Sequence, residues 1–246
     1  MHAHSRPRFR LRHLDWPVTV AIVLLHVGCV AAPFVFSWSA LVVAILLLLL
    51  TGPIGITVCY HRLLSHRSFR TPKWFEYVLT TCGCAAGQGG PVTWVGTHRL
   101  HHKHSDDEQD PHSPRHGFAW SHVFWCLYRQ QVLHWTPAGA ARDLNRDCGL
   151  RLLDRFHIIP QLVLIAACWL GGTWAAALGL HTSGISWVVW GVCVRTVFVY
   201  HSTWFVNSAS HTWGYRNYET GDGSTNLWWV ARSEEHTSEL QSQFRI

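Results

Sequence analysis

Long apolar stretches occur in two pairs along the chain, with polar segments between the pairs. The first pair covers residues 17–36 and 40–60, and the second covers 160–180 and 184–207. Each stretch has about 20 residues, the length of helix that crosses a hydrocarbon core of ~30 Å. The links inside each pair contain no charged residue. The pattern predicts an all-α integral membrane protein with two hairpins, and therefore four transmembrane helices.

The central segment shows weaker patterns. Residues 74–95 are apolar but are interrupted by the run Gly87-Gln88-Gly89-Gly90-Pro91, which predicts an interfacial or re-entrant helical segment. Residues 113–153 mix Trp, His and Arg, which is typical of amphipathic helices on a membrane surface.

The charges indicate one orientation. Only 14% of the residues are charged, against about 25% in a typical soluble domain. Arg and Lys are concentrated in an N-terminal arm, residues 1–16, and in the segment 62–155. The positive-inside rule therefore places the arm and the central segment in the cytoplasm. A basic arm could bind nucleic acid, but the apolar stretch that follows it favours an orientation signal and no nucleic-acid partner.

Histidines gather in two short motifs beside the apolar stretches. The first box, residues 61–66, begins with His61 and ends with His66, and the second box, residues 98–102, contains His98, His101 and His102. Neutral imidazole is a common ligand of transition metals, so a cytoplasmic metal site is predicted. The spacings of the second box place its histidines on one helix face. His61 and His66 would point about 140° apart on an ideal α-helix, and converge only at a bulge or an unwound end.

A third motif follows the last apolar stretch. Asn207 and His211 are four residues apart, so Asn207 could hold a metal-bound water and His211 could bind metal directly. Asp110 and His112 are candidates for orienting the ligands, because carboxylates often hold metal-bound histidines. His26 and His201 are expected to be packed or hydrogen-bonded, and His122 to lie at the surface or behind the ligands. The alternative for both boxes is a solvated basic turn.

Together these motifs resemble the membrane fatty acid desaturases of the acyl-CoA Δ9, stearoyl-CoA desaturase-like family, in its bacterial form. The same family context surrounds them in three further segments, which are Gly55-Ile56-Thr57, Asp110-Pro111-His112-Ser113-Pro114 and Gly221-Asp222-Gly223-Ser224-Thr225-Asn226-Leu227-Trp228-Trp229. The resemblance implies an oxidoreductase that inserts a cis double bond, expected at Δ9, into a saturated acyl chain, using O₂ and two electrons. It also implies that two iron ions are bound by the set His61, His66, His98, His101, His102, Asn207 and His211.

The resemblance also implies partners and a location. The substrate is expected to be a fatty acyl thioester, acyl-CoA first, or a lipid-linked acyl chain. Electrons are expected from a cytochrome b5-like protein or a ferredoxin, and the membrane is expected to be the bacterial inner membrane. Gly96-Thr97 stand where animal acyl-CoA enzymes have an Arg-Asp pair that is associated with the CoA headgroup, which puts the carrier in question.

The C-terminal end departs from the family pattern, in which a final histidine box follows the Trp pair. Residues 232–246 are polar, and their start coincides with the translation of a common sequencing-library adapter. We expect a desaturase domain over 17–231 that is truncated before the final box, and a non-native tail in which His236 is no ligand. A chain without those ligands is expected to be an inactive fragment.

Two other functions remain open from the residues. A fatty acyl hydroxylase or another diiron oxygenase shares the histidine boxes. A histidine-rich metal transporter would place its ligands near the membrane midplane, and the boxes lie at the ends of the apolar stretches. Trp94, Trp120 and Trp125 could line the mouth of a substrate tunnel, but anchoring at the membrane surface is the expected role.

Overall fold

The computed structural model describes residues 11–105, 107, 109–129, 136–215 and 225. Several predictions fall outside this part of the chain. They concern Arg6, Arg8 and Arg10 of the arm, the segments 221–224 and 226–229, and the tail 232–246.

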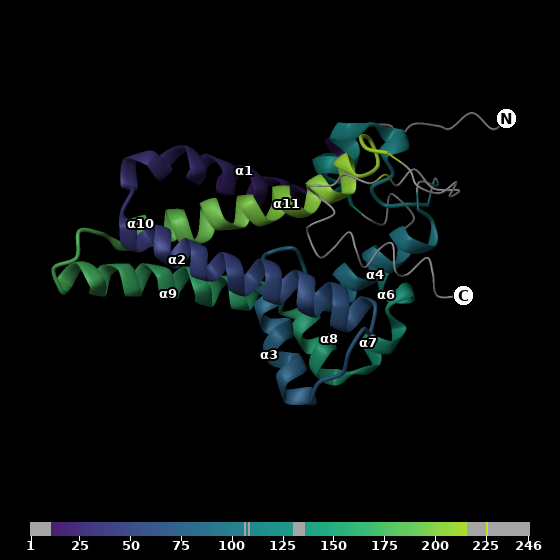
Figure 1. Cartoon of the computed structure of the whole chain (residues 1–246), viewed down its shortest axis with the longest axis horizontal. Coiled ribbons are helices and arrows are strands. Elements are labelled where there is room, and N and C mark those ends of the chain that lie inside the picture. Colours follow the sequence, from purple (N-terminus) through teal and green to yellow (C-terminus); the bar gives the residue numbers. More distant parts are fainter. Residues whose placement is uncertain (1–10, 106, 108, 130–135, 216–224, 226–246) are drawn as a thin grey trace.

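The described residues are almost entirely helical, and four helical stretches are long and apolar enough to cross a membrane. They are Trp16–Val35, Trp38–Ser65, Ile158–Ala177 and Gly184–Ala209. Figure 1 shows these stretches lying lengthwise, with the shorter helices α3, α4, α6, α7 and α8 gathered at one end. The predicted all-α fold with four spans is confirmed.

Each span is built from a small number of helical elements. The first is α1 (Trp16–Ala31) with η2 (Ala32–Val35), and the second is α2 (Trp38–Leu49) with η3 (Leu50–Ser65). The third is α9 (Ile158–Ala177). The fourth consists of α10 (Gly184–Val188), η7 (Val189–Val194) and α11 (Arg195–Ala209).

The two uncharged links meet through hydroxyl groups. Ser37 caps α2, and its Oγ lies 2.8 Å from Oγ1 of Thr182 and 2.9 Å from Oγ of Ser186. Hydroxyl pairs satisfy each other without a charge, which suits links at the end of an apolar bundle. The two hairpins are therefore joined at the end opposite the short helices.

The short helices at the other end carry the second histidine box. The segment 74–95 forms α3 (Lys73–Cys84) and the start of α4 (Pro91–Lys103), separated at the predicted Gly-rich break. Gly87 and Gly89 adopt positive φ there, a conformation that favours glycine. The remaining short helices are η1 (Leu11–His13), η4 (Pro114–His116), η5 (Trp120–Phe124), α5 (Trp125–Leu127), α6 (Pro137–Ala140), α7 (Arg142–Arg146) and α8 (Cys148–Arg155).

Asp154 fixes the start of α4. Its Oδ1 accepts hydrogen bonds from the backbone N–H groups of Val92 and Thr93, at 2.9 and 3.0 Å. A carboxylate satisfies the first amides of a helix and favours its positive dipole end. Because a side chain on Gly90 would collide with Asp154, the sequence needs glycine at this point. A buried cluster including Tyr60, Leu79 and Val95 packs η3, α3 and α4 together.

Candidate metal centre

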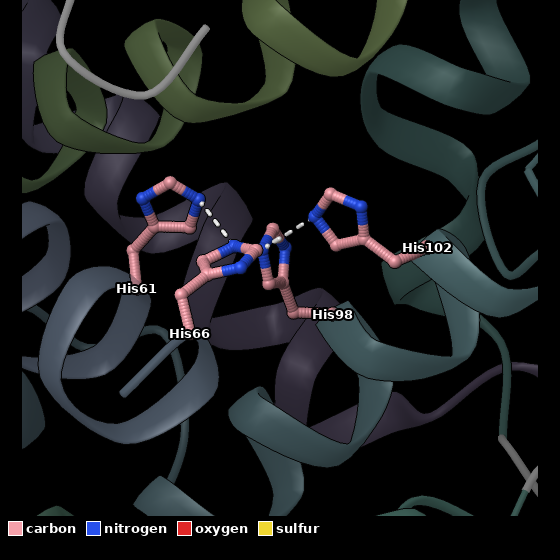
Figure 2. A group of neighbouring side chains, drawn as sticks. All are labelled: His61, His66, His98 and His102. Carbon is pink, nitrogen blue, oxygen red and sulfur yellow. Dashed lines mark hydrogen bonds between the residues drawn. The ribbon is translucent and has the colours of Figure 1, made fainter. Parts of the chain in front are cut away.

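Four histidines from the two boxes converge on one point. His61 and His66 come from the end of η3, and His98 and His102 come from α4 (Figure 2). Their Nε2 atoms form a chain of short contacts, with His66 lying 3.1 Å from both His61 and His98, and His98 lying 3.0 Å from His102. These four residues form a group able to hold a metal ion. We call them the four-imidazole group.

The first box converges because its helix is not an α-helix. η3 is a π-helix, and the N–H of His66 bonds to the carbonyl of His61 five residues earlier. Residues five apart therefore lie close to one another along the helix. The bulge that His61 and His66 need in order to converge extends over the whole first box. π-helical turns are frequent at functional sites.

The contacts within the four-imidazole group fit a metal better than hydrogen bonds. An imidazole nitrogen carries either one hydrogen or one lone pair. Nε2 of His66 faces two nitrogens, and so does Nε2 of His98, so hydrogen bonds cannot satisfy every contact. A cation at the centre would accept all four lone pairs, and imidazole suits iron, zinc and copper.

Two of the ligand candidates on α4, His98 and His102, lie in surroundings that favour the neutral form. Burial, followed by the charges of neighbouring imidazoles, lowers the pKa of His98 and His102 well below its ordinary value. A histidine must be deprotonated at the binding nitrogen to bind a metal. The site is therefore prepared for a cation near neutral pH.

A second group lies beside the first. His101 Nδ1 donates to Oδ2 of Asp110 at 3.0 Å, and the two residues form a buried metal-capable group with His112. The ring of His211 lies 5.5 Å from that of His101, and His101 is also 5.5 Å from His102, measured between ring centroids. The carboxylate fixes the tautomer of His101 in which Nε2 carries the lone pair. His211 thus lies beside the second group. Through His101 it is close to the second histidine box.

Asn207 lies at a cavity that reaches the four-imidazole group. The cavity has a volume of about 800 Å³, and its wall includes His61, His98 and Asn207. α1 contributes Val18 and Ile22 to the same wall. Ligand cavities of roughly 300–1,000 Å³ accommodate organic molecules of moderate size. The arrangement brings a cavity with both polar and apolar walls to the candidate metal ligands.

A tryptophan forms the wall next to the metal ligands. The indole of Trp94 stacks on the ring of His98, with centroids 5.1 Å apart and planes at 24°. Its Nε1 donates to Oε1 of Gln88 at 2.9 Å, and Nε2 of Gln88 donates to Oγ1 of Thr203 on α11 at 2.9 Å. Gln88 of the Gly-rich break therefore links Trp94 on α4 to Thr203 on α11.

The expectation that Trp94, Trp120 and Trp125 anchor the chain at the membrane surface is wrong for all three. Trp94 and Trp125 line the cavity, and Trp120 is 2% exposed. The amphipathic pattern of the segment was ambiguous, because a cavity wall and a membrane surface favour the same side chains.

Comparison with known proteins decides the family. Residues 36–232 match the family model described as Fatty acid desaturase. This chain belongs to the fatty acid desaturase family. It is therefore an oxidoreductase, and the resemblance carried by the histidine boxes is confirmed.

Relatives of this desaturase differ in the substrates that their names give. It is 47% identical over 220 residues to the sn-1 stearoyl-lipid 9-desaturase of Anabaena variabilis, covering 89% of this chain and 76% of the relative. It is 43% identical to the sn-2 palmitoyl-lipid 9-desaturase of Nostoc sp. (strain 36), covering 89% and 74%. It is 42% identical to an acyl-CoA 5-desaturase of Anemone leveillei, covering 84% and 61%.

Several residues at the site escaped the reasoning from sequence. Gln88 drew notice only as part of a break, although a polar side chain in a Gly-rich interruption of an apolar segment is a usable signal. Asp154 was not singled out, since nothing in the sequence shows that α8 lies against the start of α4. Asp106 and Glu108, from the acidic run beside Asp110, lie outside the described residues.

Proposed function

We propose that this desaturase introduces a cis double bond at the Δ9 position of a saturated acyl chain carried by a membrane lipid. The observation that carries the proposal is the cavity of about 800 Å³ whose wall joins apolar side chains of α1 and α11 to His61 and His98. An acyl chain in this cavity would pass next to the four-imidazole group.

Iron is the metal that we propose for both groups. The four-imidazole group would hold one ion, and His101 and His211 would contribute to the second, with Asn207 placing a water. Asp110 and His112 would orient these ligands from behind. When bound, the metal would supply the O₂-dependent oxidising chemistry for removing hydrogen from a methylene, which no side chain provides.

The chain itself would bind and position the substrate. Trp94 of α4 and Thr203 of α11 both line the cavity and are joined by Gln88, so together they would limit where the acyl chain can bend. Ile22 and Trp204 keep that part of the cavity apolar and exclude water. Holding one carbon pair at a fixed place relative to the metal is the main contribution that a protein makes to such a reaction.

Two observations favour a lipid carrier over CoA. The relatives from Anabaena variabilis and Nostoc are named for stearoyl-lipid and palmitoyl-lipid. In the present chain a Cβ on Gly96 would lie 2.0 Å from the carbonyl oxygen of Pro137, so no longer side chain fits there without movement of α6. Thr97 is buried and bonds to Thr93 of its own helix. The pair that replaces Arg-Asp therefore offers no group to a CoA headgroup.

For the electron donor we propose a cytochrome b5-like protein or a ferredoxin that docks on the cytoplasmic side. The basic segment 62–155 supplies the positive surface, and acidic redox partners associate with such surfaces through long-range attraction. The bacterial inner membrane, with the metal groups facing the cytoplasm, follows from the same charge distribution.

Reconstitution would test the proposal. The purified chain, loaded with iron, is placed in liposomes with either distearoyl lipid or stearoyl-CoA, together with a reduced donor and O₂. Mass spectrometry of the released acyl chains separates loss of two hydrogens from gain of one oxygen, and locates the double bond. We expect unsaturation at Δ9 from the lipid when the chain is extended by the missing histidine box, and little or none from the present chain. His98→Ala should abolish it, and His181→Gln, in the link between the last two spans, should not.

Other outcomes would contradict parts of this proposal. A hydroxylated product would indicate an oxygenase, and unsaturation from stearoyl-CoA alone would indicate the CoA carrier. Metal movement across the liposome without O₂ consumption would indicate a transporter.

We also propose that the desaturase domain covers residues 17–231 and that the tail 232–246 is not native. The family match ends at residue 232, which supports this boundary. Genomic DNA downstream of the codon for Ala231 should encode a further histidine box in frame. An extended chain with that box should bind more iron than the present one, and equal iron contents would contradict the proposal.

A further inference from the structure

Three histidines outside the metal groups form a continuous hydrogen-bonded chain between three elements. His26 of α1 meets His201 of α11 through their Nε2 atoms at 3.1 Å, and Nδ1 of His201 meets Nε2 of His122 of η5 at 3.0 Å. The expectation that His26 and His201 are hydrogen-bonded is confirmed, and His122 is added to them. We call these residues the histidine chain.

The histidine chain is closed at both ends by backbone carbonyls. Nδ1 of His26 lies 2.7 Å from the carbonyl oxygen of Ile22. Nδ1 of His122 lies 2.9 Å from Oγ of Ser208, whose hydroxyl lies 2.9 Å from the carbonyl oxygen of Trp204. Carbonyl oxygens only accept, so each of the two end contacts forms only when a hydrogen points outward at that end.

A hydrogen count separates the neutral chain from the protonated one. The series of hydrogen-bonded groups runs from the carbonyl oxygen of Ile22 through the three rings and the Ser208 hydroxyl to the carbonyl oxygen of Trp204. It contains five contacts, and each contact needs one hydrogen. Three neutral imidazoles and one hydroxyl supply only four. One added proton completes every contact. In the neutral form the hydroxyl turns to His122, and the carbonyl of Trp204 keeps only its bond within the helix.

The geometry favours a relay of protons over a metal site. His201 uses one ring nitrogen toward each neighbour, so the three rings cannot offer three nitrogens to one ion. The metal groups found among the described residues do not include them. The rings lie against an apolar cluster that contains Ile22, Tyr200 and Trp204.

The described elements around the histidine chain contain no carboxylate within their bounds, and Asp15 caps the start of α1, eleven residues before His26. α1, η2, α2, η4, η5, α5, η7 and α11 contain no Asp or Glu. Their other ionisable side chains are Cys29, Arg115, His116, Cys126, Cys193, Arg195 and Tyr200. Burial lowers the pKa of His122, which opposes protonation, while hydrogen bonding to carbonyls favours it. A proton bound here is therefore held by hydrogen bonds and shared among the rings.

We propose that His122, His201 and His26 form a one-proton store that runs from the level of the short helices into the membrane-spanning bundle. Ser208, at its outer end, follows Asn207 of the reaction cavity. The use of the stored proton rests on the proposed function. Reduction of O₂ to two waters takes four electrons and four protons. Two of each leave the acyl chain as hydrogen, two electrons come from the donor, and two protons must come from solvent or from a store.

The store is tested on metal-free protein, without reference to activity. The chain is labelled with ¹⁵N-histidine, placed in lipid nanodiscs and followed by NMR of the ring nitrogens from pH 8 to 5. We expect the three rings to titrate together, with one proton taken up. Replacing His201 by Phe should divide this transition into independent ones, while His181→Gln should leave it unchanged. Three independent titrations in the wild-type chain would overturn the proposal, and so would chelation of added Zn²⁺ by these rings.

Ser208→Ala is the sharper variant, because it keeps every ring. Without the hydroxyl, three contacts remain for three hydrogens, and the neutral chain is already complete. The shared transition should move to lower pH by about one unit, since a hydrogen bond to a charged group is lost. An unchanged midpoint would overturn the proposal.

Turnover tests the use of the proton. In the chain extended by the missing histidine box, the pH at half-maximal rate of lipid desaturation should move with the NMR midpoint in Ser208→Ala. A moved NMR midpoint with an unmoved rate profile would refute the role in the reaction. An extended chain without turnover would count against the proposed function, and the titration alone would then decide the store.

Discussion

The carbonyl oxygen of Leu64 accepts a hydrogen bond from Nη2 of Arg99 at 2.9 Å. Leu64 belongs to the first histidine box and Arg99 to the second, so one guanidinium joins the two boxes. The same guanidinium binds both carboxylate oxygens of Asp143, at 2.6 and 3.1 Å. Arg99 thereby connects η3, α4 and α7 directly behind the four-imidazole group.

Arg99→Lys should weaken metal binding although it retains the charge. An ammonium cannot reproduce the planar fork that reaches Leu64 and Asp143 together. Loss of partners behind metal ligands typically costs roughly 10–100-fold in metal affinity, and we expect the lower part of that range. Competitive metal titration of the purified chain would measure it. Arg67 holds Asp143 from the exposed side, so Arg67→Gln is the matched control and should change affinity much less. Equal effects would contradict this role of Arg99.

Acid should remove metal before it breaks the Arg99–Asp143 pair. Burial raises the pKa of Asp143, but hydrogen bonds from Arg99 and Arg67 outweigh it and lower the pKa to about 2. A carboxylate with a depressed pKa contributes stability above its unfolded value of ~3.9, and loses it only as pH falls through the folded value. Protons compete for histidine nitrogens at higher pH. At pH 4.5, metal analysis should therefore show an empty protein and circular dichroism an intact helical one. Simultaneous loss of metal and helix would refute this order.

Asp110→Asn should affect the second metal group selectively. The carboxylate accepts from Nδ1 of His101 and from the backbone N–H of His112, and it is 1% exposed. An amide can donate toward His101 and stabilise the wrong tautomer, whereas the four-imidazole group is untouched. We expect a 10–100-fold loss of affinity at one site only. Titration with Co²⁺, followed by its absorption bands, would resolve the two sites, and His66→Ala should produce the complementary loss. A uniform loss at both sites would show that Asp110 acts on the fold instead.

Gln88→Leu should change the position of the acyl chain relative to the metal more than it changes the affinity for the acyl chain. The substitution leaves Nε1 of Trp94 and Oγ1 of Thr203 without the side chain that joins them in the cavity wall. Trp94 can then tilt away from His98, and the acyl chain gains room next to the metal. We expect a several-fold lower rate and a mixture of double-bond positions, measured by mass spectrometry of the products. Gln88→Glu keeps the acceptor for Trp94 and should preserve the position better. A single unchanged position in Gln88→Leu would refute the assignment.

Much of the fold could be predicted because membrane insertion leaves a strong pattern. Four apolar stretches, two uncharged links and a Gly-rich break each correspond to a described element. The packing of the short helices could not be predicted in the same way. Asp154 caps α4 from 61 and 62 residues away in sequence, and no local pattern encodes such a contact.

The site was predictable in its chemistry and less so in its geometry. The ligand types and the helical face of the second box follow from spacing alone. The convergence of His61 with His66 depends on a π-helix, which sequence periodicity does not reveal. The histidine chain was missed because its three members lie in separate elements and none belongs to a motif.

Arg195 offers a final test, because it is a cation inside the last span. It is 2% exposed, and its nitrogens reach the carbonyl oxygens of Gly191 and Ala85 at 3.0 and 2.9 Å. It also contacts Thr51 and Gln161, at 3.3 and 3.5 Å. Ala85 ends α3, where the helix dipole is negative and favours a positive partner. Ionisable residues within spans are costly and are retained for a role, and here Arg195 fixes the end of α3, next to the Gly-rich break that forms part of the cavity wall.

Arg195→Lys should therefore destabilise the chain, because one ammonium cannot reach acceptors on four elements. We expect a loss of about 2–4 kcal/mol in the free energy of unfolding, measured in detergent by denaturant titration. Thr196→Val is the matched control: its hydroxyl is buried without a hydrogen-bond partner among the described residues, so an isosteric methyl group should be nearly neutral. Proteolysis at the break between α3 and α4 should accelerate in Arg195→Lys and not in Thr196→Val. If both variants unfold alike and resist protease alike, Arg195 does not hold the cavity wall.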